Sequence, residues 1–137
     1  MEAVAALREA GIAAGVSLSP ILPLINDSQD SIDAVVQKAS EAKAQWVWHN
    51  VLFLKPCARA VFLPFVEREF PHMIHRYRAR YNCSDFLTGP YLEVVKARVD
   101  RARQRFEMQE KRSQPAMPKP PQLELPFECS TGQSTCK

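Results

Sequence analysis

The chain has 137 residues, of which 46% are hydrophobic and 24% are charged, and its formal net charge is +3. These values are those of a soluble globular protein, and the mild charge neither requires nor excludes a nucleic-acid partner. No apolar stretch is long enough to span a membrane, the start lacks a signal-peptide pattern, and the four cysteines form no evident disulfide framework. We therefore expect a cytoplasmic protein without a membrane partner.

The first part of the chain predicts a helix followed by a strand–helix unit. An Ala-rich amphipathic helix is expected over 2–10. The near-continuous apolar run after it predicts a strand over 12–21, covered on both faces. Apolar residues at helical spacing then predict a helix over 29–42, for which Asp27 or Ser28 can serve as the N-cap.

The second unit begins with a strand expected over 46–54, in which His49 and Asn50 are the only strongly polar residues. Helical periodicity predicts two further helices over 58–70 and 71–81, and a long helix over 91–112. Such β/α repeats place their chemistry at the carboxyl ends of the strands.

Two strand–helix units are too few to close a barrel or to build a doubly wound sheet. We therefore expect residues 1–112 to be the C-terminal portion of a larger β/α protein, with the upstream part truncated or separate. From about 113 the sequence becomes rich in proline and polar residues. This composition predicts a disordered linker and a short linear motif over 113–137.

Two stretches, PILPLIND (20–27) and LKPCARAVFLPFVEREFPH (54–72), resemble one known family. They are similar to radical S-adenosylmethionine proteins related to spore photoproduct lyase, which are also described as DNA repair photolyase-like. The resemblance extends from residue 2 to about 106. It implies an incomplete (β/α)6 TIM-like barrel, of which this chain would hold the last two strands and the C-terminal helices.

The resemblance also implies two cofactors for the intact protein, a 4Fe–4S cluster and S-adenosylmethionine. The family holds the cluster with a C-x3-C-x2-C loop, which this sequence lacks. Cys57 and Cys83 are too far apart for that loop, and Cys129 and Cys136 lie in the tail. We therefore expect no cofactor, no metal and no catalysis for this chain alone. Its first expected partner is the missing N-terminal half of the barrel, on the same or a separate chain.

In the family, the carboxyl ends of the last two strands help to hold the adenosine part of the cofactor. The matching positions here are Ser19 and Ile21 on the first strand and Phe53 and Lys55 on the second. By this match Ser19 would form a hydrogen bond, Ile21 and Phe53 would pack against the purine, and Lys55 would face an anionic group. The alternative is that these side chains only fill the barrel interior.

Histidines and cysteines invite a metal site, but the paired ligands of a structural zinc site are missing. We therefore interpret His49, His72 and His75 as surface or boundary residues, and Cys57 as a small buried one. Arginines make the C-terminal helices basic, and two interpretations stay open. They could contact DNA phosphates, with Tyr77 or Tyr81 stacking on bases, or form a solvated helix face. These arginines are Arg76, Arg78, Arg80, Arg98, Arg101, Arg103 and Arg105.

The tail carries an apolar hexapeptide that resembles the bacterial sliding-clamp binding motif. A glutamine would anchor at the edge of a pocket, and apolar side chains would fill a groove. The residues are Gln122, Leu123, Leu125, Pro126 and Phe127. Two functions follow as hypotheses. The chain is the C-terminal fragment of a radical S-adenosylmethionine enzyme of DNA repair, or it is a non-catalytic adaptor that binds a sliding clamp and DNA.

Overall fold

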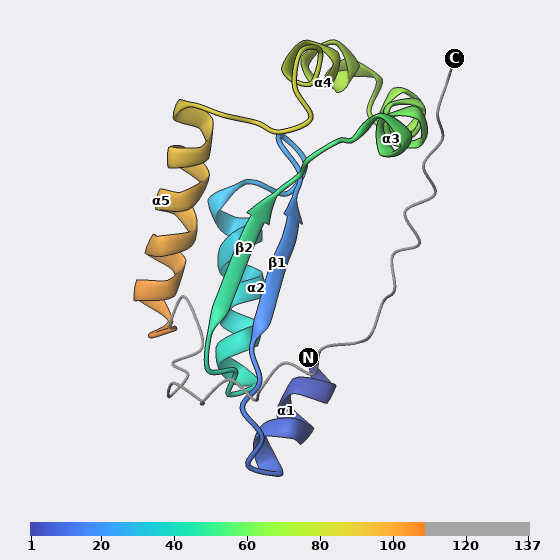
Figure 1. Ribbon diagram of the computed structural model, residues 1–137. Coiled ribbons are helices and arrows are strands. Elements are labelled where there is room, and N and C mark those ends of the chain that lie inside the picture. Colours follow the sequence, from blue (N-terminus) through green and yellow to red (C-terminus); the bar gives the residue numbers. More distant parts are fainter. Residues whose placement is uncertain (109–137) are drawn as a thin grey trace, which may run out of the picture.

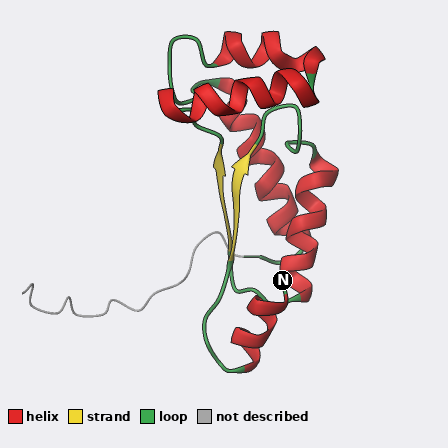
Figure 2. Cartoon of the chain, turned by 90° about the vertical axis from the view of Figure 1, so that its right-hand side faces the viewer, coloured by secondary structure: helices red, strands yellow, loops and turns green. Residues whose placement is uncertain are grey.

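The computed structural model describes residues 1–108. Strands β1 (Val16–Ile21) and β2 (Val47–Val51) form a parallel two-stranded sheet and are connected through helix α2 (Gln29–Glu41). Helix α5 (Pro90–Arg105) packs beside α2 (Figure 1). Figure 2 shows that α2 and α5 lie on one side of the sheet and that no described helix covers the other side. Within the described residues, the prediction that the first strand is covered on both faces is therefore wrong, and Ser17 and Ser19 are exposed.

The predicted order of strands and helices is confirmed, but both strands are shorter than predicted. The first begins at Val16 rather than at 12, and the second ends at Val51 rather than at 54. A strand extends only as far as it has a partner. Leu52 N still donates to Ile21 O of β1 at 2.9 Å, but Leu54 N donates to Asp85 O at 2.8 Å, outside the sheet.

Ser28 is the N-cap of α2, and its hydroxyl accepts a hydrogen bond from Ser31 N at 3.2 Å. Asp27, the other candidate for this cap, is buried, and its carboxylate accepts from the Tyr91 hydroxyl at 2.8 Å. The short serine side chain satisfies one of the free amides of the first helical turn. Asp27 does not cap the helix, and its bond with Tyr91 connects the turn before α2 to α5.

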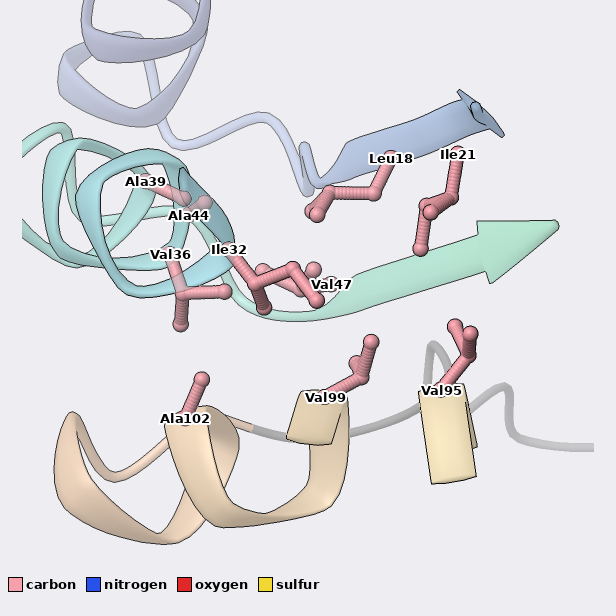
Figure 3. Packing of buried hydrophobic residues seen from close by; sticks show 10 residues of the cluster. All are labelled: Leu18, Ile21, Ile32, Val36, Ala39, Ala44, Val47, Val95, Val99 and Ala102. Carbon is pink, nitrogen blue, oxygen red and sulfur yellow. The ribbon is translucent and has the colours of Figure 1, made fainter. Parts of the chain in front are cut away.

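The first hydrophobic cluster lies between the sheet and its two covering helices (Figure 3). The buried stripe of α2 faces that of α5, and buried strand residues fill the layer between them. Val35, expected on the buried stripe of α2, is 36% exposed at its margin. The cluster contains Leu18, Ile21, Ile32, Val36, Ala39, Ala44, Val47, Val95, Val99 and Ala102.

A second cluster forms at the carboxyl ends of the strands, where α3 (Pro56–Glu69), η1 (Pro71–Met73) and α4 (Ile74–Arg80) lie (Figure 1). Two tyrosines anchor this layer. The Tyr77 hydroxyl donates to Pro23 O at 2.6 Å, and the Tyr81 hydroxyl donates to Leu52 O at 2.8 Å. The buried members are Leu52, Leu54, Val66, Ile74, Tyr77 and Tyr81.

Helix α5 ends at Arg105, so the prediction that it continues to 112 is wrong. Glu107 takes a left-handed conformation with φ of 55°, and Met108 N donates to Arg103 O at 2.8 Å. This backbone turn is a common way to close a helix. The predicted linker over 113–137 lies outside the described residues. No helix of the described part is long and apolar enough to cross a membrane.

Candidate functional site

The outer edge of β2 is closed by a side chain. Val16 N donates to Trp46 O, so the next carbonyl, that of Val47, points away from β1. Arg103 donates to this Val47 oxygen from Nε at 3.0 Å and from Nη2 at 2.8 Å. The guanidinium also pairs with Asp100 at 2.7 Å, and Arg103 is only 5% exposed. The Val47 carbonyl on this strand edge is therefore satisfied from within the chain.

The outer edge of β1 is open. The backbone groups of Ser17 and Ser19 point away from β2, because those of Val16 face it. No hydrogen bond from another described segment satisfies these groups. A hollow of about 220 Å³ lies along this edge and reaches α2, with Ser17, Ser19, Asn26, Ser31 and Val35 in its lining. An unpaired edge of this kind accepts a further strand.

The four residues matched to the cofactor site do not line one pocket. Ser19 and Ile21 border the hollow beside β1, and Ile21 is only 2% exposed because it packs into the first cluster. Phe53 lies elsewhere and is 44% exposed, in an apolar groove of about 440 Å³ against α3. Lys55 is exposed as the N-cap of α3. Ser19, Phe53 and Lys55 therefore remain accessible, whereas Ile21 presents almost no surface to a ligand.

An exposed aromatic pair that the sequence did not indicate lies beside this groove. Phe53 and Phe86 stack with ring centroids 5.4 Å apart and an interplanar angle of 22°. Phe86 is 55% exposed. Its only signal in the sequence is an apolar pair, Phe86 and Leu87, within a loop of polar and turn-forming residues. Two solvent-exposed rings at the strand ends offer a flat apolar surface to a planar group.

The arginines of α5 hold the fold together. Arg105 pairs with Asp33 at 2.8 Å, and Arg98 lies 3.6 Å from the Asp27 carboxylate. Arg101 donates to Gln29 at 3.3 Å. These partners belong to α2 or to the turn before it, so three arginines of α5 join the two covering helices. Such contacts favour the structural interpretation of this helix over the phosphate-contacting one.

The arginines of α4 differ from those of α5. Arg78 pairs with Glu67 at 3.1 Å, whereas Arg76 and Arg80 form no ion pair within the described residues. The predicted base-stacking role of Tyr77 and Tyr81 is wrong, because the two side chains are 0% and 1% exposed. Burial raises the pKa of the Tyr81 hydroxyl to about 12 and raises that of Tyr77 further. Both rings belong to the core of the second layer.

The described residues do not fit the ligand set of an iron–sulfur cluster. Among them, no group of three or more histidines, cysteines or acidic residues could hold a metal ion. Cys57 and Cys83 are free and exposed, so the interpretation of Cys57 as buried is wrong. Cys57 stands in the first turn of α3, beyond the point where that helix contacts the core. Three converging thiolates would have to come from another segment.

Comparison with known proteins gives relatives without an assigned activity. One uncharacterized protein of Mycobacterium bovis and two of Mycobacterium tuberculosis are each 30% identical to this chain over 96 residues. The matched region is 70% of this chain but only 28% of each relative. The chain thus spans less than a third of the relatives that it matches. No protein-family model and no solved structure matches it.

Proposed function

We propose that this chain forms the last two strand–helix units of a β/α barrel related to the radical S-adenosylmethionine proteins of the spore photoproduct lyase group. The proposal rests on a difference between the two outer edges of the sheet. Arg103 closes the edge of β2, while the edge of β1 is open at Ser17 and Ser19. An open edge on one side only is expected of a terminal strand pair whose sheet continues past β1.

The faces of the sheet support the same proposal. In a β/α barrel the helices lie outside, and the inner face of the strands lines the interior. Here α2 and α5 cover one face (Figure 2). Ser17, Ser19 and Trp48 are exposed and alternate along the strands with buried Leu18 and Val47, so they belong to the opposite face. Polar and aromatic side chains on an uncovered face suit an interior that holds a ligand.

The proposed role of the chain is to contact the nucleoside part of the cofactor. The Ser19 hydroxyl would donate to or accept from the ribose or base, and the exposed ring of Phe53 would stack on the purine. Lys55 would lie near an anionic group. In this class, the cluster and S-adenosylmethionine supply the radical chemistry when bound. The cluster ligands would come from the missing barrel half, and the intact protein would act in the cytoplasm, on DNA.

The relatives provide room for this architecture. Only 28% of each mycobacterial protein is matched. The remainder is long enough to supply further β/α units, which typically need 30 or more residues each. The identity of the barrel type rests on the PILPLIND and LKPCARAVFLPFVEREFPH stretches.

Strand addition at β1 gives the first test. The full chain is mixed with the unmatched part of a Mycobacterium tuberculosis relative, and complex formation is followed by size-exclusion chromatography. Ser17→Pro removes an outward N–H and should abolish association while the chain stays folded, because the bonds of Val16 to β2 are untouched. Ser17→Thr retains the N–H and should associate like the unmodified chain. Failure of the unmodified chain to associate, or association that survives Ser17→Pro, contradicts the proposal.

Nucleoside contact gives the second test. In the assembled complex, Phe53→Ala should weaken binding of S-adenosylhomocysteine by about three- to tenfold, the usual worth of one aromatic stacking contact. The matched control is Val94→Ala, since Val94 is 47% exposed on α5, away from the uncovered face. Isothermal titration calorimetry measures both. Equal affinities for the two variants would remove Phe53 from the proposed site.

A second proposal concerns the tail, which lies outside the described residues. The hexapeptide formed by Gln122, Leu123, Leu125, Pro126 and Phe127 would recruit the protein to a bacterial sliding clamp. Its support is the sequence QLELPF after a proline-rich stretch. Binding of the full chain to a purified clamp should be lost in the double variant Leu125→Ala, Phe127→Ala and kept in Ser130→Ala. No binding by the unmodified chain would reject the adaptor function.

A further inference from the structure

A second hollow lies between the end of α4, the loop after it and the first turn of α5. Its volume is about 240 Å³, and its lining includes Arg80, Ser84, Phe86, Thr88 and Tyr91. One guanidinium, three hydroxyls and two aromatic rings thus belong to the residues that line one small space. The proposed nucleoside contacts Ser19, Phe53 and Lys55 do not line it.

Arg80 is the unusual member of this group. Its guanidinium carbon stands 4.7 Å from the centroid of the Tyr91 ring, a cation–π contact that fixes its position. Arg80 has no ion pair within the described residues, and its Nη1 is buried without a hydrogen-bond partner. A buried N–H group without an acceptor is costly. Because Nη1 is buried, a ligand in the hollow would meet the exposed part of the half-buried Arg80 side chain. A guanidinium held in place without a carboxylate partner is suited to an anion with several oxygens.

The charges around the hollow do not oppose an anion. Burial raises the pKa of Tyr91, so that its hydroxyl is neutral at neutral pH. The nearby Asp27 carboxylate accepts from Tyr91 and lies 3.6 Å from Arg98. Asp85, in the loop, is paired with Arg59 at 2.9 Å. Each of these acidic groups therefore has its own counter-charge.

The start of α5 adds a favourable field. Its N-cap is Gly89, which has no side chain to satisfy the amides of the first turn. Thr88 and Tyr91 flank this position and both line the hollow. The first turn of α5, through Tyr91, therefore lines the hollow with its positive end, and the acidic residue of that turn, Glu93, does not line it.

We propose that this hollow binds the phosphate group of a nucleotide. Arg80 donates to the phosphate oxygens, and the hydroxyls of Ser84 and Thr88 complete the set of donors. Phe86, which lines the same hollow and is 55% exposed, provides a ring face for the base. The nucleotide is either free or part of a single strand, since both carry the same phosphate and base.

The test uses the full chain and three probes: inorganic phosphate, deoxyadenosine 5′-monophosphate and a 5′-phosphorylated oligodeoxynucleotide. Arg80→Gln removes the charge and should weaken binding of the mononucleotide by about tenfold or more, as expected for a charge-assisted hydrogen bond. Arg76→Gln is the matched control, because Arg76 is exposed on the same helix and does not line the hollow. Its affinity should stay within about twofold of the unmodified chain.

Thr88→Val provides a second variant that leaves the Arg80–Tyr91 contact in place, and circular dichroism verifies the fold of each variant. The loss of one hydroxyl should weaken binding about threefold to tenfold.

A mononucleotide that binds no better than inorganic phosphate would overturn the assignment to a nucleotide. No saturable binding at millimolar concentration, or equal losses in Arg80→Gln and Arg76→Gln, would overturn the site. If the oligonucleotide binds more tightly than the mononucleotide, the phosphate belongs to a single strand. If the two bind with equal affinity, the ligand is a free nucleotide.

Discussion

The two hydrophobic layers of this protein are anchored by different chemistry. In the layer beneath the sheet, the buried guanidinium of Arg103 donates to the Val47 carbonyl, and ion pairs connect α5 to α2. In the layer at the carboxyl ends of the strands, the neutral hydroxyls of Tyr77 and Tyr81 bind backbone carbonyls. The first layer closes a strand edge. The second leaves an apolar groove and a half-buried Arg80 that has no ion pair within the described part of the chain.

This difference separates an end that supports the fold from the end at which we propose ligand binding. In β/α proteins the carboxyl ends of the strands carry the chemistry, and the opposite end contributes mainly stability. The proposed ligand contacts Phe53, Phe86 and Arg80 all belong to the second layer or its loop. Substitutions in the lower layer should therefore change stability more than binding.

The largest effect is expected for Arg103→Ala. The substitution removes both hydrogen bonds to Val47 O and leaves that buried carbonyl without its donor. The free energy of unfolding should fall by about 2–4 kcal/mol. Arg101→Ala is the matched control on the same helix, because Arg101 is exposed and makes one hydrogen bond at 3.3 Å. Its cost should stay below about 0.5 kcal/mol in urea denaturation. Similar losses for the two variants would remove Arg103 from its anchoring role.

Alkaline pH should weaken the fold through its buried tyrosines, of which Tyr77 and Tyr81 lie in the second layer and Tyr91 packs against the first. Burial raises the pKa of Tyr81 from 10.0 to about 12, so the folded state retains a proton that the unfolded state releases. The resulting stability is fully present below pH 10 and is lost as the pH rises toward about 12. In this window, each tyrosine with a raised pKa lowers the free energy of unfolding by up to about 1.4 kcal/mol per pH unit.

Tyr81→Phe measures the contribution of this residue. At neutral pH the loss of the hydrogen bond to Leu52 O should cost about 1 kcal/mol. Above pH 10 the variant should lose stability less steeply than the unmodified chain, because one raised pKa is absent. Urea denaturation at a series of pH values gives both slopes. Parallel slopes would mean that Tyr81 does not titrate with unfolding.

The order of elements could be predicted from the sequence, because apolar periodicity and a serine N-cap are local signals. Long-range pairing could not. The Tyr77 hydroxyl and its acceptor are separated by 54 residues in the chain, and nothing near Tyr77 indicates burial against Pro23. The alternation of Val16, Ser17, Leu18 and Ser19 is also a local signal, since Leu18 is buried and the two serines are exposed. It breaks at Pro20, so it does not show which way Ile21 faces. Ser19 and Phe53 were predicted as site residues from the family resemblance. Phe86 and the hollow beside Arg80 could not be predicted, because they depend on how the loop after α4 packs against other segments.

The smallest effect concerns the end of α2, in the lower layer. Lys43 takes a left-handed conformation with φ of 56°, and Ala44 N donates to Ala39 O at 3.0 Å. Glycine adopts this conformation without the steric cost of a side chain, so Lys43→Gly should raise the free energy of unfolding by about 0.5–1 kcal/mol. The Lys43 carbonyl keeps its hydrogen bond from Arg8, because the backbone is unchanged.

Gly11→Ala is the reciprocal variant at the end of α1 (Glu2–Glu9). Gly11 has φ of 75°, and a Cβ there would meet no other atom within 4 Å, so the substitution tests backbone strain alone. It should lower stability by about 1 kcal/mol. Thermal and urea unfolding of the two variants should give shifts of opposite sign. Shifts of the same sign would show that side-chain contacts, rather than the left-handed backbone, decide stability at these helix ends.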